Sequence, residues 1–400
     1  MTRADLVAMA QRTLAHARAG TAPLAESVVE VPTRTYVDPN QWALEMDRIW
    51  RRVPLVLAPS VALPEAGSYV ALDVAEVPVL LSRGADGEVR AFVNSCAHRG
   101  AIVMEEGHGI ARRFTCPYHG WSYDQDGALG GILDREAFGE IEVDCHGLTA
   151  LPCEERAGFV WGSLDPQAEL DLDAWLLGYD DVLDHLGLAG CHLVGRQEVA
   201  GPNWKVAYDG YLDFYHLPIL HKDSFGPDYS NKACYDAWGP HQRLLQPDDR
   251  VIAALDTMPE DDWTDEKLTG GVWTVFPGIS VASFDVGGRM FMVSVLSPGS
   301  AVGSSRTVQY FLAPFVPDEE QQRAIDKRIE FLLGVVRDED YATGLRIQRA
   351  LATGAKDHVL FGRNEAGGQR FHEWVEALVG ADDAAALASV VATADVVHQP

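Results

Sequence analysis

Two short segments of the chain each pair a cysteine with a histidine at a spacing that suits metal binding. The first reads NSCAHRG and the second reads CPYHGW. Either pairing is rare by composition in a chain of 400 residues, and both so close together are improbable by chance. The four candidate ligands are Cys96, His98, Cys116 and His119. Because ligands on one inorganic centre tie two loops together, this pattern constrains the fold more than any other feature of the sequence.

The residues around both pairs indicate how the two loops are built. Gly100 follows the first pair and Gly120 the second, and glycine permits the tight turns found at β-hairpin tips. Short β-type runs such as SYVAL and VRAFVN alternate with turn signals such as GADG and DQDG. We therefore predict a small antiparallel β domain over residues 51–163. At this point zinc would accept the same ligand set as an iron–sulfur cluster.

The spacing resembles the Rieske [2Fe-2S] signature, in which one iron takes two thiolates and the other takes two imidazoles. The forms N-x-C-x-H-R-G and C-P-Y-H-G-W are similar to the Rieske domain of aromatic-ring-hydroxylating oxygenases, whereas zinc ribbons usually pair Cys-x-x-Cys. The resemblance implies that Cys96, His98, Cys116 and His119 bind a Rieske cluster. A Rieske electron carrier and a zinc-binding module, both without oxygenase activity, are the alternatives.

A second concentration of polar residues lies in the segment NWKVAYDGYLDFYHLPILH. Its period predicts a helix on which Asp209, Asp213 and His216 share one face. His221 would point elsewhere on a straight helix. Pro218 cannot continue the helical hydrogen bonds, so the chain must kink there. We therefore expect the imidazoles of His216 and His221 to converge on one point.

This segment resembles the mononuclear-iron motif in the large (α) subunit of the same oxygenases. A non-haem Fe(II) site takes two histidines and one carboxylate on one face of the metal. The resemblance implies that His216 and His221 are iron ligands. In the family the carboxylate lies in a C-terminal helix ahead of a glutamine, here Gln348, which implies Glu339 as third ligand with Asp340 as the alternative.

Asp213 is expected to play a different part, because one helical turn separates it from His216. A carboxylate there can accept the second N–H of the imidazole and fix its orientation. The resemblance further implies that Asp213 reaches the cluster ligand His119 of a neighbouring subunit, although a plain orienting role needs no neighbour. Asp209-Gly210 stands where the family usually has Glu-Asn, which affects only the surroundings of the ligands.

The remaining patterns indicate three regions and an α+β fold. Residues 1–50 are predicted as N-terminal helices that pack on the catalytic domain, because the run beginning DPNQW has Asp38 as cap and Pro39 at the first helical position. Residues 164–400 are predicted as the catalytic domain, with an antiparallel sheet covered by helices. The resemblance implies a helix-grip (START-like) arrangement for this domain.

Composition narrows the classes of partner. The chain has 59 acidic against 32 basic residues and a formal net charge of -27, which argues against nucleic acid or an anionic membrane surface as a partner. The first twenty residues scatter charges among apolar positions, unlike a signal peptide, and no apolar run approaches the roughly 18 residues of a membrane span. We therefore expect a cytoplasmic protein whose six cysteines are reduced thiols or metal ligands.

The resemblance implies a terminal oxygenase that activates O2 and mono- or dihydroxylates an aromatic or other small organic substrate. Oxidative O- or N-demethylation is the alternative outcome. No G-x-G-x-x-G follows a strand, so electrons from NAD(P)H should arrive through a separate flavin reductase, a ferredoxin or both. The family relationship also implies a homotrimer, with or without a small β subunit.

Residues on the strands of the second domain are candidates to line the substrate cavity, although ordinary core packing accounts for them equally well. They are Trp273, Phe276, Val281, Phe284, Phe291 and Val293. Arg289 and Lys222 are candidates to bind a substrate carboxylate, and solvated surface charge is the simpler interpretation of both.

Overall fold

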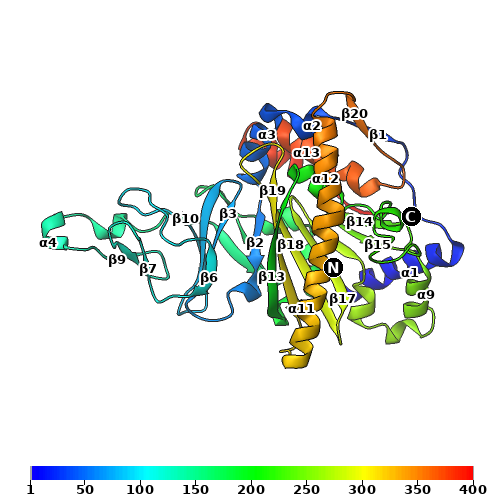
Figure 1. Ribbon diagram of the computed structural model, residues 1–400, viewed down its shortest axis with the longest axis horizontal. Helices are drawn as coiled ribbons and strands as arrows, with labels where there is room; N and C mark the ends of the chain where they lie inside the picture. Colours follow the sequence, from blue (N-terminus) through cyan, green and yellow to red (C-terminus); the bar gives the residue numbers. More distant parts are fainter. Residues whose placement is uncertain (1, 400) are drawn as a thin grey trace. The chain divides into compact units, whose positions relative to one another are not determined.

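The structure, a computed structural model, describes residues 2–399 and divides the chain into two compact units (Figure 1). The smaller unit runs from Trp50 to Asp171. The larger unit joins the residues up to Ile49 with those from Leu172 onward. The sequence predicted this domain over residues 51–163. The structure also assigns residues 164–171 to the smaller unit.

The smaller unit is built almost entirely of antiparallel strands. Their bounds are β2 Leu55–Pro59, β3 Ser68–Val74, β4 Val77–Arg83, β5 Val89–Val93, β6 Gly107–Ile110, β7 Phe114–Thr115, β8 Ser122–Tyr123, β9 Leu129–Gly131, β10 Ala150–Leu151, β11 Cys153–Arg156 and β12 Phe159–Gly162. They form one five-stranded sheet in the order β10-β5-β4-β3-β6 and two three-stranded sheets, β11-β12-β2 and β7-β8-β9. The small antiparallel β domain predicted from the sequence is thus confirmed.

The core of the smaller unit contains the two thiols of the first motif. Cys96 and Cys116 belong to one buried cluster with large aromatic side chains, namely Phe92, Phe114, Trp121 and Tyr123. Burying each large apolar side chain contributes roughly 1.5–3 kcal/mol, so this cluster holds the sheets together. The core also removes the thiols from solvent.

The larger unit is organised around an antiparallel sheet of eight strands. Their bounds are β13 His192–Gly201, β14 Cys234–Trp238, β15 His241–Leu245, β16 Val272–Val275, β17 Ile279–Asp285, β18 Arg289–Pro298, β19 Ser305–Ala313 and β21 Val396–His398. The strand order is β13-β19-β18-β17-β16-β15-β14-β21. A separate two-stranded sheet pairs β1 Val29–Pro32 with β20 His358–Phe361. The runs VWTVF, ISVASF, RMFMVSVL and TVQYFLAPF form β16 to β19, as the sequence indicates.

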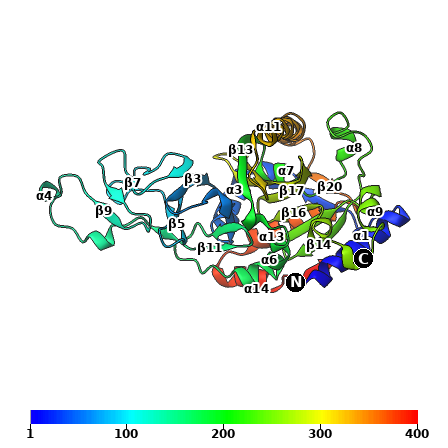
Figure 2. The ribbon, with the colours of Figure 1, turned by 90° about the horizontal axis from the view of Figure 1, so that it is seen from below.

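Helices cover this sheet. Their bounds are α1 Arg3–Ala19, α2 Arg34–Val37, α3 Pro39–Glu45, η1 Met46–Trp50, α5 Leu172–Leu176, α6 Tyr179–Asp184, α7 Trp204–Asp209, α8 Leu217–Leu220, α9 Asp249–Leu255, α10 Asp265–Leu268, α11 Glu319–Gly334, η6 Val335–Tyr341, α12 Ala342–Leu351, α13 Ala366–Gly380 and α14 Ala384–Ala392. Figure 2 shows α11 on one side of the strands and α6 and α14 on the other. The predicted antiparallel sheet covered by helices is confirmed.

Two local features follow directly from the sequence. The side chain of Asp38 accepts the N–H of Asn40, 2.8 Å away, and Pro39 opens α3, as the capping pattern predicts. Helix α13 places Phe371 against Trp204 and Tyr208 of α7, with ring centroids 5.6 and 5.0 Å apart. These contacts fix the position of α7, which leads into the second motif.

Over residues 2–399, none of the helices combines the length and the apolar character needed to cross a membrane.

Candidate active site

The two loops of the smaller unit that carry the first motif have closely similar backbones. The amide of Gly100 donates to the carbonyl of Cys96 at 2.8 Å, and the amide of Gly120 donates to the carbonyl of Cys116 at 3.1 Å. The two glycines have φ of 71° and 70°, in the left-handed region that a side chain disfavours. Each loop therefore turns tightly just after its histidine.

The donor atoms of these loops separate into a buried thiol pair and an imidazole pair nearer the surface. The ring centroids of His98 and His119 lie 4.6 Å apart. His98 stacks on Trp121 at 5.0 Å, and Cys96 Sγ lies 3.2 Å from the hydroxyl of Tyr123. The buried Nδ1 of His98 has no hydrogen-bond partner among the described residues.

This donor set fits a Rieske cluster. The cluster requires two thiolates on one iron and two imidazoles on the other, with neutral imidazole nitrogens free to coordinate. Desolvation and the neighbouring His119 lower the pKa of His98, which favours the neutral ring that a metal needs. Coordination of iron by Nδ1 of His98 would explain why this buried nitrogen has no hydrogen-bond partner.

In the larger unit, the segment expected to be one helix is broken after Asp209. Helix α7 ends there, and α8 begins only at Leu217. The reason is local, because Gly210 disfavours helix and Asp213 Oδ1 accepts the backbone N–H of His216 at 3.1 Å, an alternative to the helical bond. Asp213 therefore does not lie on a common helical face with His216.

The break nevertheless brings the two histidines together. His216 stands immediately before α8 and His221 immediately after it, and Pro218 lies in the first turn of this short helix. Their ring centroids are 5.2 Å apart. Asp213 Oδ1 lies 2.9 Å from His216 Nδ1, which leaves Nε2 of that ring facing the point where the two imidazoles converge.

The nearest carboxylate to this point is Asp340. Asp340 Oδ1 lies 3.0 Å from His221 Nε2 and 3.8 Å from His216 Nε2. One ligand atom from each of the three residues lies within 4.8 Å of the others. The donor set of two imidazoles and one carboxylate fits the arrangement that binds non-haem Fe(II).

The structure differs here from the sequence expectation, which favoured Glu339 over Asp340. Glu339 Oε2 lies 2.6 Å from His221 Nδ1, the ring nitrogen that faces away from the convergence point, and it accepts the hydroxyl of Ser224 at 2.9 Å. The physical reason is η6, a π-helix whose wider turn changes which residue of the run faces inward. Spacing along a regular helix could not reveal this change.

Carboxylates thus lie on both sides of the two imidazoles. Burial opposes protonation of His216, yet Asp213 and Asp340 together raise its pKa above the ordinary value. Burial likewise opposes protonation of His221, whose pKa Asp340 and Glu339 raise. The electrostatics of the site therefore favour a cation between the rings, and the orienting carboxylates set which ring nitrogen faces it.

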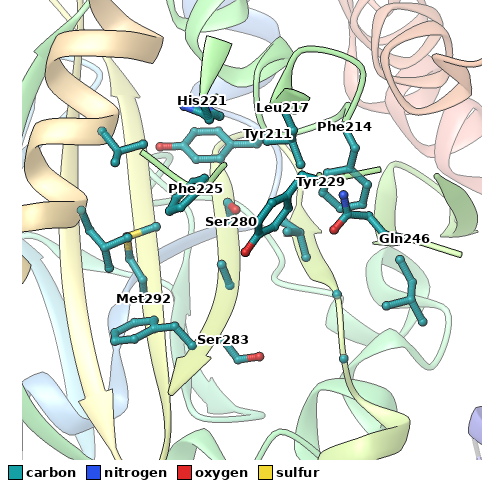
Figure 3. Close-up of a pocket in the computed structure, with 18 of the residues that line it drawn as sticks. Tyr211, Phe214, Leu217, His221, Phe225, Tyr229, Gln246, Ser280, Ser283 and Met292 are labelled. Atoms are coloured by element: carbon teal, nitrogen blue, oxygen red, sulfur yellow. The ribbon is translucent and has the colours of Figure 1, made fainter. Parts of the chain in front are cut away.

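A cavity of about 590 Å³ opens beside His216, His221 and Asp340. Figure 3 shows Tyr211 and Phe225 lying between His221 and the strand residue Met292, with Tyr229 beside Ser280. The cavity is of the size and largely apolar character typical of sites for small organic ligands. A smaller cavity of about 290 Å³ is also lined by Asp213, His216 and Asp340.

Most of the strand residues proposed as lining lie in the core instead. Phe284 does line the larger cavity, whereas Trp273, Phe276, Val281, Phe291 and Val293 are buried elsewhere. Alternation accounts for the first part of β17, where Ser280 and Ala282 line the cavity and Val281 between them does not, whereas Ser283, Phe284 and Asp285 at its end all line it. Arg289 donates to Thr269 and does not line the cavity, nor does Lys222.

Sequence reasoning missed several cavity residues. Gln246 and Arg328 line the cavity from a loop and from α11, and Ser224 supports Glu339. No spacing pattern marks these positions, because they come from separate segments that only the fold brings together. The helical period of α11 would have placed Arg328 near the sheet, but not toward a cavity.

Comparison with known protein families matches both units. A model described as the Rieske [2Fe-2S] domain matches residues 53–142. A model described as the ring hydroxylating alpha subunit (catalytic domain) matches residues 172–381, which is more than half of the chain.

Two curated proteins illustrate the range of relatives. The carnitine monooxygenase oxygenase subunit of Escherichia coli (strain K12) is 27% identical over 337 residues, which cover 80% of this chain and 84% of that protein. The large oxygenase component of the 2,4-dinitrotoluene dioxygenase system of Burkholderia sp. (strain RASC) is 34% identical over 197 residues. That alignment covers 46% of this chain and only 43% of the relative, so it spans less than half of that protein.

Solved structures share the fold. The crystal structure of naphthalene 1,2-dioxygenase from Rhodococcus sp. bound to indole aligns with a TM-score of 0.73 at 21% identity, over 95% of this chain and 99% of that one. At this level of identity the likeness establishes the architecture of the chain rather than its substrate.

Proposed function

The chain belongs to the family of ring-hydroxylating oxygenase α subunits, and from that membership we propose which residues hold its metals and how it meets its partners. It is an oxidoreductase of the Rieske type, with a domain for a [2Fe-2S] cluster and a catalytic domain for mononuclear iron. Such chains are the terminal oxygenases of their systems. They receive electrons and use them to oxidise a small molecule with O2.

We propose Cys96, His98, Cys116 and His119 as ligands of the cluster, and His216, His221 and Asp340 as ligands of the mononuclear iron. The observation that carries the second assignment is the group of two imidazoles and one carboxylate at the end of a 590 Å³ cavity. When bound, the iron would supply O2 activation with electrons relayed by the cluster. The protein supplies the geometry in which this chemistry meets the substrate.

The surrounding residues orient the ligands and exclude water. Asp213 accepts from His216 Nδ1 and Glu339 from His221 Nδ1, so each imidazole presents Nε2 to the centre. Ser224 fixes Glu339 by donating to the same carboxylate oxygen. Phe225 packs against the His221 ring at 5.3 Å and covers the cavity side of the ligand. Removal of water in this way protects reactive oxidising chemistry from side reactions.

We propose that the protein works as a homotrimer in which electrons cross between subunits. Apolar side chains near the smaller cavity are exposed, with Ile219 76% and Leu360 61% accessible. On the smaller unit, Tyr118 and Leu133 beside the cluster loops are 60% and 73% accessible. Exposed apolar side chains at two electron-transfer sites support docking of one onto the other in a neighbouring copy. Asp213, bonded to His216 and lining the smaller cavity, would then reach His119 of the partner subunit.

The electron-transfer chemistry and the free cysteines support a proposal for the electron donors and for the cellular location of the protein. We propose a ferredoxin, a flavin reductase or both as donors, with NAD(P)H as the source. A reducing, cytoplasmic setting suits the six free cysteines of the chain, two of which must remain available as thiolate ligands. Catabolism of aromatic compounds is the proposed role.

The proposed reaction is mono- or dihydroxylation of an aromatic or other small organic substrate. Oxidative removal of an O- or N-methyl group is the second candidate, because it begins with hydroxylation of a methyl C–H at the same centre. Figure 3 shows Tyr211, Leu217 and Phe225 on the cavity wall near His221, a surface compatible with both reactions.

The test of the proposed function compares the wild type with His221→Ala. The wild type should be red-brown, show the EPR signal of a reduced Rieske cluster, and consume O2 only with substrate, NADH and a surrogate reductase. His221→Ala should keep the EPR signal and lose the O2 uptake. A colourless zinc protein, or equal uptake by the variant, would overturn the proposal.

A further inference from the structure

We propose that Arg328 binds an anionic group of the substrate, so that the cavity takes a two-ring aromatic carboxylate with its apolar end toward His221. This inference rests on the proposed function, whose site it deepens. Arg328 lies on α11 and lines the same cavity as His216, His221 and Asp340. The helix that carries Arg328 continues without a break into η6, which carries Asp340.

Of the three described cations that line the cavity, Arg250 and Lys267 have hydrogen-bond partners, whereas the Nε of Arg328 has none. Arg250 pairs with Asp248 at 2.6 Å, and Lys267 donates to the carbonyl of Ala254 at 2.9 Å. The guanidinium of Arg328 has no carboxylate within ion-pair distance among the described residues, and its Nε is buried without a hydrogen-bond partner. A buried donor of this kind costs free energy unless a ligand satisfies it.

Aromatic rings hold the Arg328 side chain in place. Its guanidinium carbon lies 5.0 Å from the Phe331 ring centroid and 5.8 Å from that of Phe284. Both contacts are of the cation–π type, and they restrict the side chain without neutralising its charge. A planar guanidinium held between rings is suited to bind a carboxylate through two parallel N–H bonds.

A continuous series of aromatic contacts connects Arg328 with the proposed iron site. The Phe331 ring lies 5.8 Å from Phe225, and the Phe225 ring lies 5.3 Å from His221. Phe331 is itself exposed, but Phe284 beside Arg328 and Phe225 beside His221 both line the cavity and pack against Met292 and Leu332. A flat apolar body can lie along these lining side chains, with one end at the guanidinium and the other at His221. The helical rise over the twelve residues from Arg328 to Asp340 sets an upper limit of about 18 Å for their separation along the axis. Two fused rings with one carboxylate are a suitable probe, because they fit a cavity of about 590 Å³.

The acidic residues of the cavity do not offer a comparable site for an organic cation. Asp213 and Asp340 are engaged by the histidines, and Asp248 is paired with Arg250. Asp285 is exposed at the rim. The charges therefore favour an anion over a quaternary ammonium group in this cavity.

The experiment measures binding of three matched probes to anaerobic holoenzyme by isothermal titration calorimetry. The probes are 2-naphthoate, 2-naphthamide and 2-naphthyltrimethylammonium. We expect 2-naphthoate to bind about tenfold more tightly than the amide, because a bidentate ion pair with the guanidinium replaces a hydrogen bond to an uncharged carbonyl. Arg328→Gln should remove most of that preference, with a smaller change in amide affinity because the glutamine amide still donates to a carbonyl, and Arg328→Lys should keep part of the preference.

Arg323→Gln is the matched control. Arg323 lies on the same helix and pairs with Glu319 at the surface, so this variant removes the same charge away from the cavity. It should leave all three affinities unchanged, and iron content and melting temperature should show that each variant is folded. Equal affinity for naphthoate and amide, tighter binding of the ammonium probe, no binding of any probe, or an unchanged preference in folded Arg328→Gln would each overturn the proposal. Binding needs no turnover, so a failed oxygenation assay would be distinguishable from a failed substrate assignment.

Discussion

The imidazoles of His216 and His221 are each held by a carboxylate on the nitrogen that does not face the convergence point. At His216 this carboxylate is Asp213, which also accepts the backbone N–H of the same residue. Asp213 therefore stabilises both the turn and the ring orientation. The same residue lines the smaller cavity, which supports its proposed role as the connection from the proposed iron site to a partner subunit.

Asp213→Ala should separate metal binding from turnover. We expect it to keep the Rieske EPR signal and most of the mononuclear iron, yet to lower substrate-dependent O2 uptake at least about tenfold, as loss of a ligand's orienting partner typically does. Iron analysis and an oxygen electrode measure the two effects. Retained substrate-dependent oxygenation would contradict an electron-bridging role for Asp213.

His241 provides a stability prediction outside the site. Its Nε2 donates to the carbonyl of Trp175 and its Nδ1 accepts the N–H of Phe276, so the buried ring must be neutral. Burial lowers the pKa of His241 from 6.5 to about 3. Between these values only the unfolded chain binds the proton, so this contribution to stability is complete above pH 6.5 and is lost as pH falls toward 3.

His241→Gln removes this titration while keeping one donor and one acceptor. The stability of the wild type should fall relative to the variant by up to about 1.4 kcal/mol per pH unit below pH 6.5. Urea unfolding followed by circular dichroism at pH 8, 6 and 5 measures this difference. A constant difference between the two proteins over that range would argue against a neutral buried His241.

At the scale of the elements, α7 is positioned by α13. Phe371 packs against Trp204 and Tyr208 of α7 and lies 5.8 Å from the ring of Phe276. Phe371→Ala should cost about 3–5 kcal/mol, because it leaves a cavity among these rings. Phe371→Leu, which keeps most of the volume, should cost less than about 1.5 kcal/mol.

The two variants also test how packing supports the proposed iron site. Phe371→Ala should lose mononuclear iron on dialysis, because α7 leads into the turn that holds Asp213 and His216. The Rieske EPR signal should persist, since the proposed cluster ligands belong to the other unit. Thermal unfolding and iron content measure the outcome, and an Ala variant as stable as the Leu variant would contradict this packing role.

The structure of these elements also explains which site residues could be predicted from the sequence and which could not. Both proposed ligand pairs of the cluster and both histidines of the second motif lie in short segments, so their spacing is visible in the sequence. The third carboxylate lies more than one hundred residues later, and its register depends on the π-helical turn η6. The family pattern ahead of Gln348 favoured Glu339, whereas the wider turn directs Asp340 to the histidines.

The sequence period also failed to predict where helix α7 ends. The apolar period over the second motif suggested one long helix, but Gly210 and the turn at Asp213 end it early. Local side-chain hydrogen bonds compete with helical bonds there. The fold class was predictable from strand and helix periods, while the cavity lining was not, because it combines residues from α11, β17 and loops.

At the scale of the whole molecule, the net charge of the chain affects how an anionic substrate approaches the cavity. A net charge of -27 repels an anionic substrate at long range, but at physiological ionic strength exposed charges are largely screened beyond about 8 Å. Arg328 acts within that distance inside the cavity. Local charge can therefore set substrate preference against the sign of the overall charge.

The proposed trimer is testable through Ile219 and Leu360. Sedimentation should give about three times the 43.7 kDa mass of the chain. Ile219→Asp combined with Leu360→Asp should shift the protein toward monomer and lower turnover while leaving both metals bound. A wild type that sediments as a monomer with full activity would contradict electron transfer between subunits.

The most direct test that the chain holds both a cluster and a mononuclear iron is the iron content of the purified wild type and of variants at the adjacent positions 339 and 340. The wild type should hold about three iron atoms per chain, two in the cluster and one mononuclear. Asp340→Ala should hold about two, with an unchanged Rieske EPR signal, whereas Glu339→Gln should stay near three because the amide still accepts from His221. Two iron atoms in the wild type, or loss of iron from Glu339→Gln with retention in Asp340→Ala, would contradict the account.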